Sequence, residues 1–370
     1  MITDRFKETI RRCAQCGTCT AGCPTSEQGV FNIRRMVRTL QLDLHEDKEF
    51  LAKIPWLCTL CERCSVLCYE GLEIPKLVKA LREHALKNGV KPEKAMMLLE
   101  AIRRAENPYT SKTRTKNTWH ESVPGGVRMS PNADLLYWVG CTSAMMAPNI
   151  PKAAAGTLNN LGIEFKMLDN EPCCAEPLIC FGLLDEAAKI ASKILQKVRQ
   201  AKVKRIVTSC SGCYYTFTRT YPEVLGVKFT DIEILHTSQL VGQGIKDGSG
   251  LAKAKKPLKV TYHDPCTLGR LSGIYDDPRK VIQAIEGVTL VEMPLIRELA
   301  TCCGSGGGMW TYDYKTALEI CAAKINREVV PLGVDAIVTS CPSCYLNFKR
   351  SLAKLKSSIK IYDLTELGGL

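Results

Sequence analysis

Apolar residues recur at helical spacing through the first part of the chain. One apolar face runs over residues 30–40 after Ser26, a residue type that caps helices. Two more stripes, over residues 77–85 and 96–102, each follow a proline that suits the first turn of a helix. We therefore predict that residues 1–105 form a helical domain, with these stripes packed in its core.

The pattern changes after a stretch rich in Thr, Ser, Lys, Pro and Gly, which predicts a linker over residues 106–133. Short apolar runs typical of strands then alternate with helical stretches. The predicted strands cover residues 135–139, 163–168, 205–208, 259–262, 289–293 and 336–339, and the predicted helices cover residues 184–200 and 317–330. Such alternation favours largely parallel sheets.

The second half of this region repeats the first. Residues 206–214, with the sequence IVTSCSGCY, match residues 337–345, with the sequence IVTSCPSCY. The repeat is far longer than the roughly 20–50 residues of a solenoid unit, so it indicates two similar α/β modules, at 134–248 and 249–370. A glycine- and lysine-rich stretch over residues 242–257 predicts the connection between them. The predicted fold class is α+β and multidomain, a helical ferredoxin-type domain followed by two duplicated modules.

The chain has 370 residues, 20 cysteines and a formal net charge of +12. No apolar stretch approaches the roughly 18–20 residues of a membrane helix, and the start lacks the apolar core of a signal peptide. We therefore expect a cytoplasmic protein, where disulfides are rare, with any membrane association provided by a partner. Metal-bound cysteines are thiolates, so part of the basic excess can offset cluster charge. Since no nucleic-acid-binding motif is present, we expect no nucleic-acid partner.

Eighteen of the 20 cysteines fall into two patterns, each used twice. The first pattern consists of Cys13, Cys16, Cys19 and Cys23, and again of Cys58, Cys61, Cys64 and Cys68. The second pattern consists of Cys141, Cys173, Cys174, Cys210 and Cys213, and again of Cys266, Cys302, Cys303, Cys341 and Cys344. Cys180 and Cys321 lie outside both patterns, on predicted helices, and are expected to be core thiols.

The first pattern has the C-x2-C-x2-C-x3-C spacing of bacterial ferredoxins, in which three cysteines hold one [4Fe–4S] cubane and the fourth holds the other. We therefore assign one cluster to Cys13, Cys16, Cys19 and Cys68, and the other to Cys58, Cys61, Cys64 and Cys23. Structural zinc favours paired C-x2-C units and is the weaker alternative. Tyr69 rather than a proline follows Cys68, a small departure from the ferredoxin pattern.

The second pattern supplies five cysteines per copy, one more than a cubane uses. Adjacent cysteines cannot easily hold two corners of one small cubane. Five thiolates therefore indicate either a larger iron–sulfur assembly or a cubane with one free cysteine. Zinc in one copy is a further alternative.

Around these cysteines the chain resembles the catalytic subunit of heterodisulfide reductase, in its single-chain form or as its two-subunit form fused head to tail. The motifs that carry the resemblance are Gly140-Cys141-Thr142, Cys173-Cys174-Ala175-Glu176-Pro177-Leu178, His263-Asp264-Pro265-Cys266, Cys302-Cys303-Gly304-Ser305-Gly306-Gly307-Gly308 and Cys341-Pro342-Ser343-Cys344-Tyr345. The resemblance implies that each cysteine-rich "CCG" module holds a noncubane [4Fe–4S] cluster on its five cysteines. It also implies that the disulfide of coenzyme M and coenzyme B binds between the two clusters and is reduced there.

Disulfide cleavage takes two electrons, and two flanking clusters can each supply one, with the ferredoxin-type clusters as the path leading in. Arg270 and Lys349 are candidates for binding the anionic groups of such a substrate, placed by sequence proximity only. His263 is a candidate proton donor, with a hydrogen-bonded structural histidine as the alternative. Two positions depart from the family: Ala175 replaces the glycine of Cys-Cys-Gly, and Thr267 stands where many relatives carry a histidine.

The glycine run Gly304–Gly308 does not match G-x-G-x-x-G, so we expect it to approach a cluster closely rather than to hold a phosphate. No flavin or nicotinamide signature is present, so electrons must come from a partner, expected to be a flavoprotein or a membrane cytochrome subunit of a larger redox complex. The alternative function is an electron-transfer subunit of a hydroxyacid or glycerol-3-phosphate oxidoreductase, or of a dissimilatory sulfur-metabolism complex. A zinc-stabilised interaction protein is a third alternative.

Overall fold

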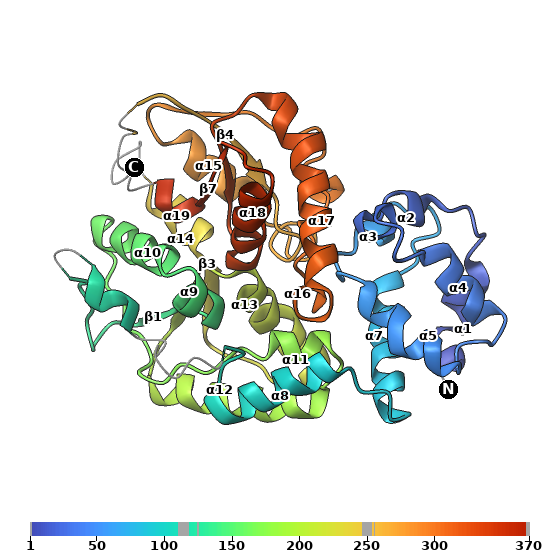
Figure 1. The fold of residues 1–370 in the computed structure, drawn as a ribbon. Coiled ribbons are helices and arrows are strands. Elements are labelled where there is room, and N and C mark those ends of the chain that lie inside the picture. The colour runs from blue at the N-terminus through green and yellow to red at the C-terminus, as the bar shows by residue number, and fades with distance from the viewer. Residues whose placement is uncertain (1, 110–117, 124–125, 246–253, 255, 368–370) are drawn as a thin grey trace.

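The structure, a computed structural model, describes residues 2–109, 118–123, 126–245, 254 and 256–367. Figure 1 shows helices of the N-terminal region on one side and two α/β modules on the other. This arrangement, with parallel strands in both sheets, confirms the predicted fold class. The predicted linkers over residues 106–133 and 242–257 lie partly outside the described residues.

The N-terminal region is helical, as the apolar stripes predict. Its elements are α1 (Ile2–Arg12), α2 (Thr18–Ala21), α3 (Pro24–Glu27), α4 (Ile33–Gln41), α5 (Lys48–Lys53), the 3₁₀-helix η1 (Ile54–Leu57), α6 (Arg63–Val66), α7 (Ile74–Lys87) and α8 (Glu93–Ala105). Helix α4 buries its apolar face and begins after Asn32, whose side chain accepts a hydrogen bond from the backbone N–H of Arg35. The prediction that Ser26 caps this helix is therefore wrong, since Ser26 lies inside α3 and Gly29, at a φ of 73°, follows that helix.

The first module has a three-stranded parallel sheet in the order β1-β2-β3. Its elements are the 3₁₀-helix η2 (Thr118–Ser122), β1 (Leu135–Trp138), α9 (Cys141–Met146), α10 (Asn149–Asn160), α11 (Glu176–Cys180), α12 (Leu184–Gln200), β2 (Arg205–Thr208), α13 (Ser211–Tyr215), the π-helix η3 (Thr216–Leu225), β3 (Glu233–His236) and α14 (Thr237–Gly244). The prediction of a full strand over residues 163–168 is wrong, because this segment pairs with β1 only through an isolated bridge between Lys166 and Leu136. Strand β3 is an element that the sequence pattern missed.

The second module has a four-stranded parallel sheet in the order β5-β4-β6-β7. Its elements are β4 (Leu258–His263), α15 (Asp276–Gln283), β5 (Val288–Leu290), the 3₁₀-helix η4 (Arg297–Leu299), α16 (Met309–Tyr312), α17 (Tyr314–Lys324), the π-helix η5 (Ile325–Val329), the 3₁₀-helix η6 (Val330–Leu332), β6 (Ala336–Thr339), α18 (Pro342–Lys354), β7 (Lys360–Asp363) and α19 (Leu364–Leu367). The helix predicted over residues 317–330 is divided among α17, the π-helix η5 and the 3₁₀-helix η6.

The two modules repeat individual interactions as well as elements. Tyr137 on β1 and Tyr262 on β4 each hydrogen-bond a serine that follows the neighbouring strand, at 3.0 and 3.2 Å. His236 and Asp363 are the final residues of β3 and β7, and each side chain accepts a hydrogen bond from the backbone N–H two residues later. The duplication read from the sequence is therefore a duplication of structure.

The three regions pack closely against one another. Helix α10 contacts α19 and α9 contacts α18, so the modules share a helical interface. Helix α8 contacts α11 and α16, and Figure 1 shows it beside α11 and α12 along the lower edge of the view. Just after α8, the carbonyl of Glu106 accepts a hydrogen bond from the backbone N–H of Cys173 at 2.7 Å. The end of the N-terminal region is thus joined to the adjacent cysteines of the first module.

We expect the buried carboxyl of Asp363 to make the free energy of unfolding depend on pH. Burial raises the pKa of this fully buried carboxyl to about 7, against about 3.9 in an unfolded chain. Between these two pKa values the Asp363 carboxyl is protonated in the folded state and ionised in the unfolded state. Raising the pH through this window therefore lowers the free energy of unfolding, and the loss persists at higher pH. We expect Asp363→Asn to lose less stability than the wild type between pH 5 and pH 8, measured by urea unfolding at each pH.

The control for this comparison is Asp231→Asn, because Asp231 is exposed and its replacement leaves the buried carboxyl in place. Unfolding midpoints of Asp363→Asn that fall with pH as steeply as those of the wild type would contradict the assignment.

Candidate functional site

The cysteines of the second pattern lie where the parallel strands end. Cys141 and Cys210 follow β1 and β2, and Cys266 and Cys341 follow β4 and β6. The carboxyl ends of parallel strands are the usual place for sites in open α/β sheets. The adjacent pairs, Cys173–Cys174 and Cys302–Cys303, join these cysteines from the loops before α11 and α16.

Within each module the sulfur atoms converge. In the first, Cys213 Sγ lies 3.3 Å from Cys174 Sγ, and Cys141 Sγ lies 3.8 Å from Cys173 Sγ. In the second, Cys303 Sγ lies 3.2 Å from Cys344 Sγ. Nine of these ten cysteines are buried and Cys266 is half-buried. Several buried thiols from separate segments form a donor set that fits iron–sulfur clusters.

The ferredoxin-type cysteines also gather in the two sets that the crossed pattern predicts. Cys13, Cys16, Cys19 and Cys68 line one small cavity. In the other set, burial raises the pKa of Cys64 well above its ordinary value, and the neighbouring Cys58, Cys61 and Cys23 raise it further. Cys16 is exposed, whereas Cys58, Cys61 and Cys64 are buried. One site therefore reaches the surface and the other lies inside.

The inner ferredoxin-type site adjoins the second module. A hydrogen bond between the Cys61 and Cys302 thiols, together with burial, raises the pKa of Cys61. The Cys61 thiol also lies close enough to Cys266 to raise its pKa. Cysteines of the two patterns, far apart in the sequence, thus meet at one point, and it is the second module rather than the first that receives this contact.

The glycine run explains how close this approach is. A Cβ on Gly307, which has a φ of 60°, would lie 2.6 Å from the carbonyl oxygen of Thr59, and one on Gly306 would lie 3.0 Å from the same atom. A Cβ on Gly308 would lie 2.9 Å from the ring of Phe181. These glycines let the second module approach the backbone of the ferredoxin loop and the first module. Their approach to a cluster itself stays a prediction.

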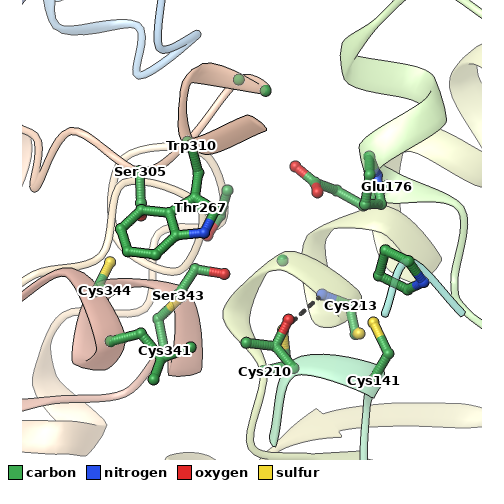
Figure 2. A pocket seen from close by; sticks show the side chains of 18 of the residues that line it. Cys141, Glu176, Cys210, Cys213, Thr267, Ser305, Trp310, Cys341, Ser343 and Cys344 are labelled. Atoms are coloured by element: carbon green, nitrogen blue, oxygen red, sulfur yellow. Dashed lines mark hydrogen bonds between the residues drawn. The ribbon is translucent and has the colours of Figure 1, made fainter. Parts of the chain in front are cut away.

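A cavity of about 180 Å³ lies between the two modules. Eight of the ten module cysteines line it, namely Cys141, Cys174, Cys210, Cys213, Cys266, Cys303, Cys341 and Cys344. Figure 2 shows the two cysteine sets facing each other across it, with Trp310 on one side and Glu176 on the other. Among the described residues of the lining, Glu176 is the one with a charged side chain, and burial raises its pKa.

Arg270 and Lys349 do not line this cavity. The Arg270 guanidinium donates to the carbonyls of Cys61, Glu298 and Ala300 at 2.6, 2.8 and 2.5 Å. The Lys349 side chain is exposed and lies over the ring of Tyr345 at 5.8 Å. Sequence proximity to a cluster cysteine therefore misplaced both side chains: Arg270 joins the ferredoxin loop to the second module, and Lys349 faces outward on α18.

His263 lies behind the second cysteine set rather than in the cavity. It is 1% exposed, and burial lowers the pKa of its ring to about 3. A ring nitrogen and the sulfur atoms of Cys303 and Cys344 lie within 4.8 Å of one another. Thr267, at the position of the family histidine, donates its hydroxyl to Ser211 Oγ of the first module at 2.8 Å. This contact joins the modules beside the cavity.

Sequence reasoning missed Arg82, which is fully buried on α7. Its guanidinium donates to the carbonyls of Pro55, Cys58, Cys180 and Gly307 at 2.6–2.8 Å. The signal was present in the sequence: Arg82 lies four residues after Val78 and three before Ala85, on the buried face of the helix. A charged residue inside an apolar stripe indicated a buried role.

Comparisons with known proteins agree with this architecture. The family model of a cysteine-rich domain, named CCG, matches residues 135–218 and 260–349, and that of a 4Fe-4S dicluster domain matches residues 9–72. The chain is 29% identical to a subunit of the dihydromethanophenazine:CoB–CoM heterodisulfide reductase of Methanosarcina mazei, over 96% of this chain and 92% of that protein. It is 28% identical to a subunit of the fumarate reductase (CoM/CoB) of Methanothermobacter marburgensis, over 97% of this chain and 71% of that protein.

A solved structure, a hypothetical protein from Helicobacter pylori, shares the fold. The TM-score is 0.64 at 12% identity, over 91% of this chain and 67% of that one. Within the described residues, no helix is both long and apolar enough to cross a membrane.

These findings define the class of the protein: it is an iron–sulfur oxidoreductase with an N-terminal 4Fe-4S dicluster domain. More closely, it is an iron–sulfur protein with two CCG domains that resembles the heterodisulfide reductase chain of Methanosarcina mazei along almost its whole length.

Gly304 and Ala175 provide a matched test of the backbone around the adjacent cysteines. Ala175 already takes a left-handed φ of 64°, so Ala175→Gly should change stability by no more than about 1 kcal/mol. Gly304 has a φ of 93°, and a Cβ there would lie 2.6 Å from the carbonyl oxygen of Ala317. We expect Gly304→Ala to cost roughly 2–4 kcal/mol and to lower iron content, measured by thermal unfolding and iron analysis. Equal effects of the two substitutions would refute this account.

We expect replacement of Arg82 to lower the stability of the protein. Arg82→Met leaves four buried carbonyls without their donor, each at a cost of roughly 1–3 kcal/mol. Anaerobic thermal unfolding should show a large fall in Tm, with a smaller fall for Arg82→Lys. Arg103→Met is the control, because Arg103 is half exposed and its ion pairs lie at the surface, where such pairs contribute little to stability. A Tm for Arg82→Met equal to that of the control would contradict the prediction.

Proposed function

We propose that this protein reduces a disulfide, the heterodisulfide of coenzyme M and coenzyme B, in the cavity between its two modules. The observation that carries the proposal is that cysteines of both complete sets line the same cavity. A protein that only passed electrons along would not need two five-cysteine sites to face one cavity. The relatives named for heterodisulfide reductase and for CoM/CoB support the same substrate class.

The proposed cofactors are two cubane [4Fe–4S] clusters and two noncubane [4Fe–4S] clusters. When bound, these clusters would supply electrons one at a time. The first cubane would be held by Cys13, Cys16, Cys19 and Cys68, the second by Cys58, Cys61, Cys64 and Cys23, and each noncubane cluster by the five cysteines of its module. Reduction of a disulfide to two thiols consumes two electrons and two protons, which matches two flanking sites.

The residues of the chain would position the substrate and limit the access of water. Trp310, Pro177 and Leu346 give the cavity apolar walls, which favour the carbon chains on either side of a disulfide. Thr267 and Ser211 hold the two modules together at its edge. Since His263 does not line the cavity, the two protons would reach the substrate through water.

Electrons would enter at the exposed site around Cys16 and leave the inner site beside Cys61. The contact between Cys61 and Cys302 supports the second module as the first of the two that would receive them. The donor would be a flavoprotein or a membrane cytochrome subunit that docks near Cys16 within a larger redox complex.

The test is anaerobic analysis of the whole chain followed by turnover. Four clusters imply about sixteen irons, at about four per cluster, and reduced viologen should be oxidised when the heterodisulfide is added. Cys303→Ser should lose iron and most of this turnover, whereas Cys321→Ser, a buried cysteine outside both sets, should keep both.

Two results would contradict the proposal in different ways. About eight irons together with zinc would leave only the two cubanes, at about four irons each, and would remove the two-cluster site. Full iron without disulfide-dependent turnover would instead favour an electron-transfer subunit.

A further inference from the structure

The imidazole ring of His263 is a buried hydrogen-bonding group that lacks a partner among the described residues. Its two ring nitrogens have no hydrogen-bond partner there, although the residue is 1% exposed. The ring packs edge-on against Phe348, with centroids 4.9 Å apart and an angle of 69°. A ring nitrogen lies within 4.8 Å of Cys303 Sγ and Cys344 Sγ. A buried N–H without a partner destabilises the folded state, so the functional state should provide an acceptor.

The first module carries an equivalent donor. Trp138 precedes Cys141 by three residues, as His263 precedes Cys266. Its ring packs edge-on against Phe217, with centroids 4.9 Å apart and an angle of 85°. Its Nε1 is also buried, with no hydrogen-bond partner within the described ranges. Both modules therefore place an aromatic N–H at the carboxyl end of their first strand, three residues before a cysteine.

The surroundings of His263 leave sulfur as its natural acceptor. The ring packs on Phe348, which offers no side-chain hydrogen-bond acceptor. Charged groups near the ring, among them Lys324, Asp264 and Glu328, have other partners. Lys324 donates to Thr301 and Glu328, and Asp264 accepts from Arg279 and from the backbone of Arg297. A neutral imidazole keeps one N–H donor. A ring nitrogen lies within 4.8 Å of Cys303 Sγ and Cys344 Sγ but hydrogen-bonds neither of them in this structure, so the acceptor would be sulfur of the iron–sulfur centre held at these cysteines.

We propose that the ring N–H of His263 donates a hydrogen bond to sulfur of the iron–sulfur centre held by the second module, and thereby raises its midpoint potential. The inference rests on the proposed function only in requiring iron at this module. Donors to cluster sulfur stabilise the reduced, more negative form, and hydrogen bonding to sulfur is one of the factors that set cluster potentials. Because the first module has an indole at this place, the two centres differ in potential although their cysteine patterns are the same.

The test uses the full chain with reconstituted clusters and ¹⁵N-labelled histidine. Pulsed EPR of the reduced second centre should show a ¹⁵N coupling that is lost in His263→Phe. A redox titration should show a lower midpoint potential for that centre in His263→Phe, with at least partial recovery in His263→Trp, which introduces the donor of the first module.

Trp138→Phe is the matched control, since it should shift the potential of the other centre and leave the ¹⁵N-histidine coupling unchanged. If His263→Phe does not keep its iron, the wild-type spectrum still tests the hydrogen bond. A ¹⁵N coupling in the wild type supports it, and the absence of a coupling contradicts it. Iron at the second module without a ¹⁵N coupling, or with an unchanged potential in His263→Phe, would overturn the inference and leave the proposed function standing. A second module without iron would overturn both.

Discussion

The arrangement of the three regions depends on one buried guanidinium. Arg82 donates to carbonyls of the helical region, of the first module at Cys180 and of the second module at Gly307. Burial lowers the pKa of Arg82, and the nearby Cys58 and Cys180 thiols oppose that shift. Arginine suits this place because its rigid fork presents five N–H donors, whereas lysine presents three. One side chain therefore fixes the position of the inner ferredoxin-type site relative to both modules.

The glycine run is a consequence of this constraint. For Gly307 to reach Arg82, its loop must lie directly on the backbone of Thr59, with no space for a side chain. Arg270 completes the contact from the other side by donating to the carbonyl of Cys61. Electron transfer needs short separations between centres, and here backbone packing and two arginines provide the short separation. The residues that keep the sites close are thus different from the residues that would bind the clusters.

Features that short stretches of sequence determine could be predicted from the sequence alone. Cysteine spacing and helical periodicity identified the helical region, the two modules and the residues that converge on the cavity. The edge strand β3 has only four residues and is exposed at its start, so it lacks the apolar run of a buried strand. Arg270 and Arg82 were missed as contacts between regions because their partners lie far away in the chain. Spacing identifies residues that share a loop, but it does not show which loops meet.

The duplicated modules keep the same sulfur arrangement in different electrostatic surroundings. In the first, α12 buries only alanine, isoleucine and valine side chains. In the second, α17 and η5 bury the ion pair of Lys324 and Glu328, which contacts Thr301 next to Cys302. Charges and donors act strongly in a buried, low-dielectric site. Two sites with the same cysteine pattern can therefore differ in redox behaviour without any change of ligand, and in the second module the buried ion pair lies beside the cysteines.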